Sequence, residues 1–398
     1  MSQTIAAIAT PPAPSAIGIL RLSGDGAIEA AAAVFRPAGG KSLAEYESRR
    51  LVYGTLLGPD GAPIDQALAT VSRAPRSYTG EDTAEFQCHG SPAVLQLGLE
   101  ALFAQGVRQA GPGEFTRRAF LNGKLDLTQA EAVADLIDAE TPAAVRQAAG
   151  QLSGALGRRV GAIYDGLVDL MAHFHAVLDY PDEDIDPFRA DTIRAGLEEA
   201  RAGLSALLAT YERGRYIAGG VPCVLVGRPN AGKSSLLNAL VGYDRAIVTD
   251  VPGTTRDTVE ARCRLGGVVL KLIDTAGLRD TEDAVERIGV ARSRAALEEA
   301  RLALLVVDGS EPLTAEDLAA MDEAEKAPRV LCLVNKSDRP LAADVDALRR
   351  RFPNLRVVSA ATGAGLEALE GDIASLFPTG GAEAAGELLT NARQAEAA

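Results

Sequence analysis

The chain contains the stretch Gly227-Arg228-Pro229-Asn230-Ala231-Gly232-Lys233-Ser234, which fits the pattern G-x-x-x-x-G-K-S. It follows an apolar run at 223–226 and precedes a helix-like segment at 235–240. A strand, a glycine-rich loop and a helix in this order form a phosphate-binding loop, because backbone N–H groups can then approach the phosphates. Lys233 is expected to reach the terminal phosphates and Ser234 to hold Mg²⁺. The predicted nucleotide contacts of this loop are Asn230, Ala231, Gly232, Lys233, Ser234 and Ser235.

Two further motifs follow in the order that a GTP site requires. Asp274-Thr275-Ala276-Gly277 comes after the apolar run 268–273, where the carboxylate can hold Mg²⁺ through water and the N–H of Gly277 can meet the γ-phosphate. Asn335-Lys336-Ser337-Asp338 comes after the apolar run 330–334, and Ser359-Ala360-Ala361 closes the base pocket. A carboxylate at Asp338 accepts from the N1 and N2 donors of guanine, which adenine lacks. The motifs therefore predict a GTPase rather than an ATPase.

The residues that would catalyse hydrolysis lie between and after these motifs. The segment Gly253-Thr254-Thr255-Arg256-Asp257 lies between the first two motifs, and Thr255 is assigned to Mg²⁺ and the γ-phosphate in the triphosphate state. Leu278 follows the D-x-x-G glycine, where Ras-type GTPases carry a water-orienting glutamine. Glu286 is the nearest candidate for that role, and its alternative is a solvated position on a helix face. The side chain of Asn230 can bind a monovalent cation that does the work of an arginine finger.

The pattern of apolar residues divides the chain into three parts and a tail. Residues 1–118 show strand-like runs at 16–22, 51–57 and 68–71 and a helix at 92–105, which predicts an α+β domain. Residues 119–216 are expected to be helical, with an apolar stripe from Leu152 to Val177 on one long helix and a second helix from Ile193 to Tyr211. Residues 217–377 alternate strands and helices, which predicts an α/β domain with a mostly parallel sheet. Residues 378–398 are expected to be a short, mobile tail.

Composition excludes several classes of protein. The 398 residues carry a formal net charge of −14, contain no Trp and are only 4% aromatic, which argues against a protein that stacks many bases. The four cysteines have neither zinc-site spacing nor a disulfide framework, so a reducing compartment is expected. We find no secretory signal and no membrane-length apolar run, which predicts a cytoplasmic protein without a membrane partner.

The chain resembles a known family, the tRNA-modification GTPases called MnmE or TrmE. The phosphate-loop stretch matches, but the N-terminal stretches are more diagnostic. They are Gly18-Ile19-Leu20-Arg21-Leu22-Ser23-Gly24, Tyr78-Thr79-Gly80-Glu81-Asp82, Gly111-Pro112-Gly113-Glu114-Phe115-Thr116, Arg118-Ala119-Phe120-Leu121-Asn122-Gly123-Lys124-Leu125-Asp126-Leu127 and Gln129-Ala130-Glu131-Ala132-Val133-Ala134-Asp135-Leu136-Ile137. The resemblance implies an N-terminal folate-binding domain that dimerises, a helical domain, and a G domain inserted within the helical domain.

The resemblance also implies an activity and a set of partners. Family members are potassium-activated GTPases whose G domains dimerise. With a flavoprotein partner, MnmG or GidA, the homodimer forms a heterotetramer that adds an aminomethyl or carboxymethylaminomethyl group to carbon 5 of the wobble uridine in tRNA. Formyl-tetrahydrofolate occupies the N-terminal domain, and methylene-tetrahydrofolate supplies the carbon.

Site residues are implied by matching positions. Folate contacts fall on Arg21, Glu85 and Lys124, although the residues alone would allow ordinary surface roles for all three. Glu286 is implied to position the attacking water. Potassium ligands fall on Asn230, Thr249, Val251 and Thr254. GTP contacts are expected along Thr249, Asp250, Val251, Pro252, Gly253, Thr254 and Thr255.

The chain departs from the family pattern at its C-terminal end. Family members continue with further helices and a tail that carries a cysteine, whereas this sequence stops at Ala398. We therefore expect the stripe from Leu152 to Val177 to lack part of its covering, either destabilising the helical domain or leading to coverage in a dimer. Two alternatives to the modifying enzyme are a GTPase switch in ribosome assembly and a truncated GTPase without modification activity.

Overall fold

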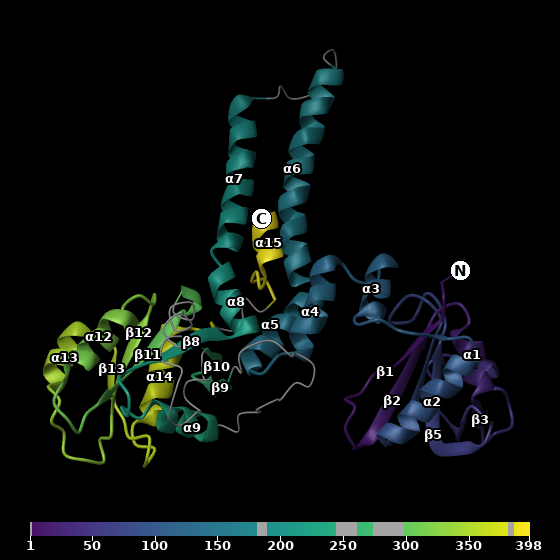
Figure 1. Cartoon of the computed structure of the whole chain (residues 1–398). Helices are drawn as coiled ribbons and strands as arrows, with labels where there is room; N and C mark the ends of the chain where they lie inside the picture. The colour runs from purple at the N-terminus through teal and green to yellow at the C-terminus, as the bar shows by residue number, and fades with distance from the viewer. Residues whose placement is uncertain (1, 181–188, 244–260, 274–297, 381–385) are drawn as a thin grey trace. The chain divides into compact units, whose positions relative to one another are not determined.

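The computed structural model describes residues 2–180, 189–243, 261–273, 298–380 and 386–398 (Figure 1), with the side chains of 241 and 243 excepted. The chain forms two compact units, Met1–Val133 and Ala134–Ala398. Each unit has its own hydrophobic core. Within the described residues, no helix combines the length and the apolar character needed to cross a membrane.

The first unit is α+β, as predicted. Its described residues form a seven-stranded sheet with the order β3-β4-β5-β6-β2-β1-β7, antiparallel except between β1 and β7. The strands are β1 (Ile5–Ile8), β2 (Ser15–Ser23), β3 (Phe35–Pro37), β4 (Val52–Leu57), β5 (Pro63–Ser72), β6 (Thr83–Gly90) and β7 (Arg108–Gln109). The helices are α1 (Ala27–Ala33), η1 (Leu43–Glu45), α2 (Pro92–Ala104), α3 (Glu114–Leu121) and α4 (Leu127–Ile137), the last of which crosses the boundary between the units.

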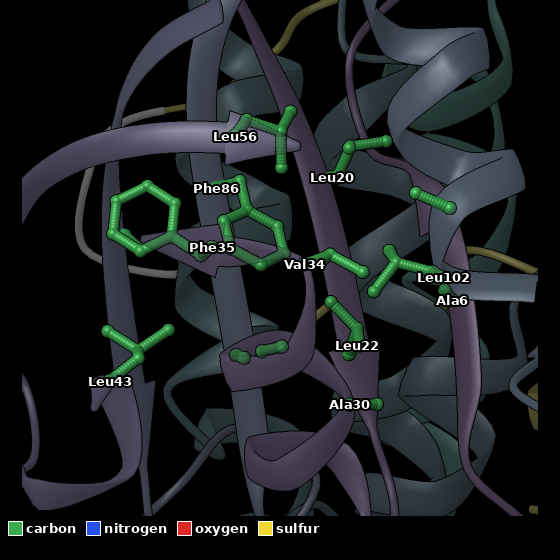
Figure 2. Close-up of a cluster of buried hydrophobic side chains, with 14 of the residues drawn as sticks. Ala6, Leu20, Leu22, Ala30, Val34, Phe35, Leu43, Leu56, Phe86 and Leu102 are labelled. Atoms are coloured by element: carbon green, nitrogen blue, oxygen red, sulfur yellow. The ribbon is translucent and has the colours of Figure 1, made fainter. Parts of the chain in front are cut away.

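The core of this unit decides which side chains its sheet presents on the other face. Figure 2 shows Phe86 of β6 beside Phe35, with ring centroids 5.7 Å apart, and Leu20 and Leu22 of β2 in the same cluster. Because successive side chains of a strand point to opposite faces, the residues between these core positions turn away from the core. Arg21 and Glu85 occupy such positions and are register partners on β2 and β6. Core packing therefore brings these two predicted site residues together.

The second unit begins with helices. They are α5 (Pro142–Leu152), α6 (Ala155–Asp179), α7 (Ala190–Leu208) and α8 (Tyr211–Gly219). The predicted single stripe from Leu152 is wrong at its start, because Leu152 ends α5 and Gly154, at φ +85°, begins α6. Tyr211 likewise starts α8 instead of ending α7. Helices α6 and α7 run side by side (Figure 1), and several apolar side chains of α6 stay exposed, among them Tyr164, Met171 and Leu178.

A mostly parallel sheet follows, as predicted. Its order in the described residues is β13-β12-β11-β8-β10-β9, and only the β9–β10 pair is antiparallel. The strands are β8 (Val221–Val226), β9 (Ala261–Leu265), β10 (Val268–Ile273), β11 (Leu302–Asp308), β12 (Val330–Asn335) and β13 (Leu355–Val357). The helices are α9 (Lys233–Tyr243), α12 (Ala315–Ala324), α13 (Val345–Arg351) and α14 (Leu366–Leu376). The carboxyl ends of β8, β11 and β12 lie at one edge, the usual place for a ligand in such a sheet.

The C-terminal segment contradicts the predicted mobile tail where it is described. Residues 386–398, which include α15 (Ala392–Ala397), pack among the helices of the second unit. Leu388 is 4% exposed and Leu389 is 2% exposed, and the carbonyl of Leu388 accepts from the side-chain amides of Gln147 at 3.1 Å and Gln151 at 2.8 Å. The prediction of a mobile tail rested on the Gly/Ala-rich composition of this stretch and did not consider the apolar pair Leu388-Leu389, which favours burial.

Candidate functional site

The phosphate loop joins β8 to α9, and its glycines are required by close backbone approaches. A Cβ on Gly227 would lie 2.3 Å from the carbonyl oxygen of Val306. A Cβ on Gly232 would lie 2.2 Å from Nδ2 of Asn335, and the φ of Gly232 is +99°. Asn230 also has a positive φ, +61°, which asparagine tolerates better than most residues. The loop therefore passes directly over neighbouring strands and presents its backbone at the sheet edge.

Lys233, the first residue of α9, reaches back over this loop. Its Nζ donates to the carbonyl of Gly227 at 2.6 Å and to the carbonyl of Arg228 at 2.9 Å. Burial lowers the pKa of Lys233, since a low-dielectric surrounding disfavours its charge. Ser234 and Ser235 follow in the first helical turn, where backbone N–H groups favour an anion. The ammonium group of Lys233 and the N–H groups at the start of α9 together favour the binding of nucleotide phosphates at this loop.

Asn335 connects the two halves of the predicted nucleotide site. It ends β12 and is 2% exposed. Its Nδ2 donates to the carbonyl of Ala231 in the phosphate loop at 3.1 Å, and its Oδ1 accepts from the backbone N–H of Ala360 at 3.0 Å. The structure thus brings together three separate sequence motifs, which were predicted to share one site, through one buried side chain.

Asp338 is fixed at the far end of the same site. Its Oδ1 accepts from Oγ of Ser359 at 2.5 Å, and the same Oγ accepts from the N–H of Thr362 at 3.2 Å. The hydrogen bond from Ser359 holds the pKa of Asp338 below its ordinary value. The carboxylate is therefore an acceptor at neutral pH, as recognition of a guanine edge requires. Ala360 and Ala361 follow Ser359 in the adjoining turn.

Lys336 contacts Asp308, a residue that the sequence motifs did not mark. Its Nζ donates to the carbonyl of Asn230 at 3.0 Å and to Oδ2 of Asp308 at 2.6 Å. Asp308 ends the buried strand β11 and is 3% exposed. The available signal was an acidic residue directly after an apolar run, but no motif spacing marked it.

Several predicted residues lie outside the described residues, so their roles stay predictions. They are Thr249, Asp250, Val251, Pro252, Gly253, Thr254, Thr255, Asp274, Thr275, Ala276, Gly277 and Glu286.

Arg21 and Glu85 form an ion pair on the face of the first sheet that turns away from its core. Nε of Arg21 donates to Oε1 of Glu85 at 2.6 Å, and the side chains are 35% and 29% exposed. The guanidinium also lies 5.9 Å from the ring centroid of Tyr78 and 5.8 Å from that of Phe115. These two aromatic residues were not predicted as site residues, although both belong to the diagnostic N-terminal stretches. The arrangement offers charge, a hydrogen-bond acceptor and ring faces in one place.

Lys124 lies beside the loop that carries Tyr78. Its Nζ donates to the carbonyl of Pro75 at 3.2 Å, and a Cβ on Gly80 would lie 3.2 Å from Cγ of Lys124. A cavity of about 430 Å³ opens at this loop. It is lined by Ser2, Asp25, Ala74, Gly80, Glu81, Asp82 and Asn122. The lining includes none of the predicted folate residues Arg21, Glu85 and Lys124.

A partly buried charge network holds this loop against α3. Arg118 is 11% exposed and donates to Glu81 at 2.8 Å and to Glu114 at 3.1 Å. Arg108 donates to the same carboxylate of Glu114 at 2.6 Å. Hydrogen bonds from Arg108, the N–H of Gly111 and Arg118 lower the pKa of Glu114 to about 2. The loop is therefore positioned by charges that persist throughout the neutral pH range.

Comparisons with known proteins identify the family of this chain. A family model described as the N-terminus of the GTP-binding protein TrmE matches residues 4–124, and one described as the MnmE helical domain matches residues 127–398. A tRNA modification GTPase MnmE from Symbiobacterium thermophilum is 46% identical over 99% of this chain and 86% of its own length. One from Thermus thermophilus is 48% identical over 100% of this chain and 87% of its own. The G domain of the FeoB iron transporter of T. maritima is 28% identical over 39% of this chain and 97% of that chain, with a TM-score of 0.31. Because both family models and full-length relatives match, the chain belongs to the MnmE family of tRNA modification GTPases.

Proposed function

We propose that the second unit binds GTP between the phosphate loop and Asp338 and hydrolyses it. The observation that carries this proposal is the double hydrogen bonding of Asn335, which joins the phosphate loop to the loop at Ala360. A single ligand can therefore contact Lys233 with its phosphates and Asp338 with its base. Glu286 is proposed to position the attacking water.

We propose Mg²⁺ and K⁺ as the ions of this site. Ser234 in the first turn of α9 and Thr255 are the proposed Mg²⁺ ligands. The proposed K⁺ ligands are Asn230, Thr249, Val251 and Thr254. The donor chemistry fits hard cations, because hydroxyl and carbonyl oxygens are their preferred ligands. The backbone carbonyl of Asn230 is engaged by Lys336, so its side-chain amide is the proposed ligand. These cations supply positive charge that stabilises the transferring phosphoryl group.

We propose that the chain acts in the cytoplasm as a homodimer in tRNA wobble-uridine modification, with the flavoprotein MnmG as partner. Formyl- or methylene-tetrahydrofolate is the proposed ligand of the first unit. Membership of the family supports this proposal, and so does the site around Arg21. Glu85 suits the donor edge of a pterin, Arg21 pairs with that carboxylate at 2.6 Å, and the nearby rings suit the flat face of the pterin.

The GTPase proposal is tested by changing the base that Asp338 selects. An amide in place of the carboxylate keeps one oxygen that accepts from N1–H of either base, offers a donor to the C2 carbonyl of xanthine and loses the acceptor for the N2 amino group of guanine. We expect Asp338→Asn to hydrolyse XTP and to lose at least tenfold in kcat/KM for GTP, about 1.4 kcal/mol. Hydrolysis is measured for both nucleotides in KCl and in NaCl. A variant that keeps the GTP preference of the unmodified chain would contradict the assignment of the base site.

The folate proposal is tested by calorimetric titration with 5-formyl-tetrahydrofolate. Arg21→Ala is expected to abolish binding, because it removes the cation that pairs with Glu85. Arg36→Ala, which changes an exposed arginine on β3, serves as the control and is expected to bind like the unmodified chain. If the Arg21→Ala variant binds 5-formyl-tetrahydrofolate as tightly as the unmodified chain, Arg21 is not part of the folate site.

A further inference from the structure

Asp308 faces positive charge from two loops. Its Oδ2 accepts from Nζ of Lys336 at 2.6 Å and lies 3.7 Å from Nη2 of Arg228. Its Oδ1 accepts from the N–H of Ser310 at 2.9 Å and from the hydroxyl of Ser310 at 2.7 Å. Burial raises the pKa of this carboxyl, but the hydrogen bonds from Lys336 and Ser310 outweigh burial and hold the pKa below its ordinary value. The group is therefore a buried anion at neutral pH, with both oxygens engaged.

The two cations belong to opposite ends of the proposed nucleotide site. Arg228 is part of the phosphate loop, and its side chain also reaches Asp317 at 3.2 Å and Glu311 at 2.5 Å. Lys336 is part of the guanine-recognition motif, and its Nζ reaches back to the carbonyl of Asn230 in the phosphate loop. The carboxylate of Asp308 therefore stands between the loop that holds the phosphates and the loop that holds the base.

The surrounding charges indicate what removal of this anion would do. Without it, Lys336 would lose its carboxylate partner, while Arg228 would keep Glu311 and Asp317. A charged group that loses a buried partner either moves toward water or remains at a large energetic penalty. Movement of Lys336 would release its hydrogen bond to Asn230 and alter the spacing of the two loops.

We propose that Asp308 is a positioning residue for nucleotide binding. It sets the separation of the phosphate loop and the guanine loop, and it acts through Lys336 and Arg228 without contacting the nucleotide. This inference rests on the proposed GTP site. A merely structural role would lower the melting temperature and leave nucleotide affinity unchanged for the folded protein.

The test measures binding of a fluorescent GDP analogue to the full chain, well below the melting temperature of each variant. We expect Asp308→Asn to bind about tenfold more weakly, the size of one lost charge-assisted hydrogen bond, chiefly through faster dissociation. Asp372→Asn is the matched control. It removes a carboxylate from an ion pair with Arg356 in the same unit, a pair that includes no proposed nucleotide contact, and is expected to keep full affinity.

Two further measurements separate the possible failures. Asp308→Glu, which keeps the charge, is expected to recover part of the lost affinity. If Asp308→Asn does not fold, Ser310→Ala loosens the same carboxylate more gently and should weaken binding two- to threefold. Wild-type affinity in the folded Asp308→Asn variant, or in Ser310→Ala when it is needed, would overturn the positioning role. Failure of the unmodified chain to bind GDP would instead overturn the proposed function.

Discussion

Glu114 shows how strongly a single carboxylate can be held in this protein. It receives hydrogen bonds from Arg108 at 2.6 Å, from Arg118 at 3.1 Å and from the N–H of Gly111 at 2.8 Å. Its side chain is 17% exposed. Because Arg118 also binds Glu81, Glu114 helps to position the loop beside the proposed folate site.

The lowered pKa of Glu114 predicts how the first unit responds to acid. The pKa of Glu114 is lowered from 4.5 to about 2 in the folded chain, so its contribution to stability is full above pH 4.5 and is lost as the pH falls toward 2. We expect Glu114→Gln to be less stable at neutral pH and to lose less stability over that acid range. Hydrogen–deuterium exchange of peptides from residues 108–124 measures this. Glu100→Gln, at an exposed position on α2, is the control, and an unchanged acid response in Glu114→Gln would contradict the prediction.

The proximity of candidate site residues was predictable where a motif has a fixed spacing. Lys233, Asn335 and Asp338 belong to such motifs, and the structure places them along one edge of a sheet. Asp308 belongs to no such motif, and Tyr78 lies in a diagnostic N-terminal stretch that gave it no role in the site. Their roles arise because strand register and loop path bring distant residues together, and that information is absent from the local sequence.

At the scale of elements, burial explains both the successes and the failures of the sequence analysis. The continuous apolar runs at 302–307 and 330–334 are central parallel strands, and such strands are buried on both faces. The break between α5 and α6 was missed because the apolar steps continue across it. Only Gly154, whose φ is +85°, marks the change of direction.

Helix α8 predicts how the C-terminal segment is held. A Cβ on Gly214 would lie 2.1 Å from the carbonyl oxygen of Leu389, whereas a Cβ on Gly219 of the same helix would meet open space. We expect Gly214→Ala to destabilise the second unit by about 1–3 kcal/mol through overpacking and to speed hydrogen–deuterium exchange in residues 386–398. Gly219→Ala should change stability by no more than about 1 kcal/mol. Equal exchange in the two variants would show that the segment is not seated on α8.

At the scale of the whole molecule, the two compact units have separate cores and separate proposed ligands. The folate residues Arg21, Glu85 and Lys124 lie in the first unit, whereas the described GTP residues lie in the second. A ligand that binds only the folded form of one unit stabilises that unit against unfolding. Each ligand should therefore report on its own unit.

Differential scanning calorimetry of the full chain tests this separation. GDP at 100 times its dissociation constant is expected to stabilise the second unit by about 2.7 kcal/mol and to raise one thermal transition. GDP should leave the transition temperature of the first unit unchanged, whereas 5-formyl-tetrahydrofolate should raise it. A single transition that both ligands raise together would contradict independent units.

The burial of the C-terminal segment has a consequence for the order of events during protein synthesis. Gln147 and the carbonyl it binds at Leu388 are separated by 241 residues. At roughly 5–20 residues per second, a ribosome needs about 10 to 50 seconds to make the intervening chain. In the later part of that interval α5 to α8 have been made but the segment that completes their core has not, so the translation speed of the later codons sets how long their apolar faces stay exposed.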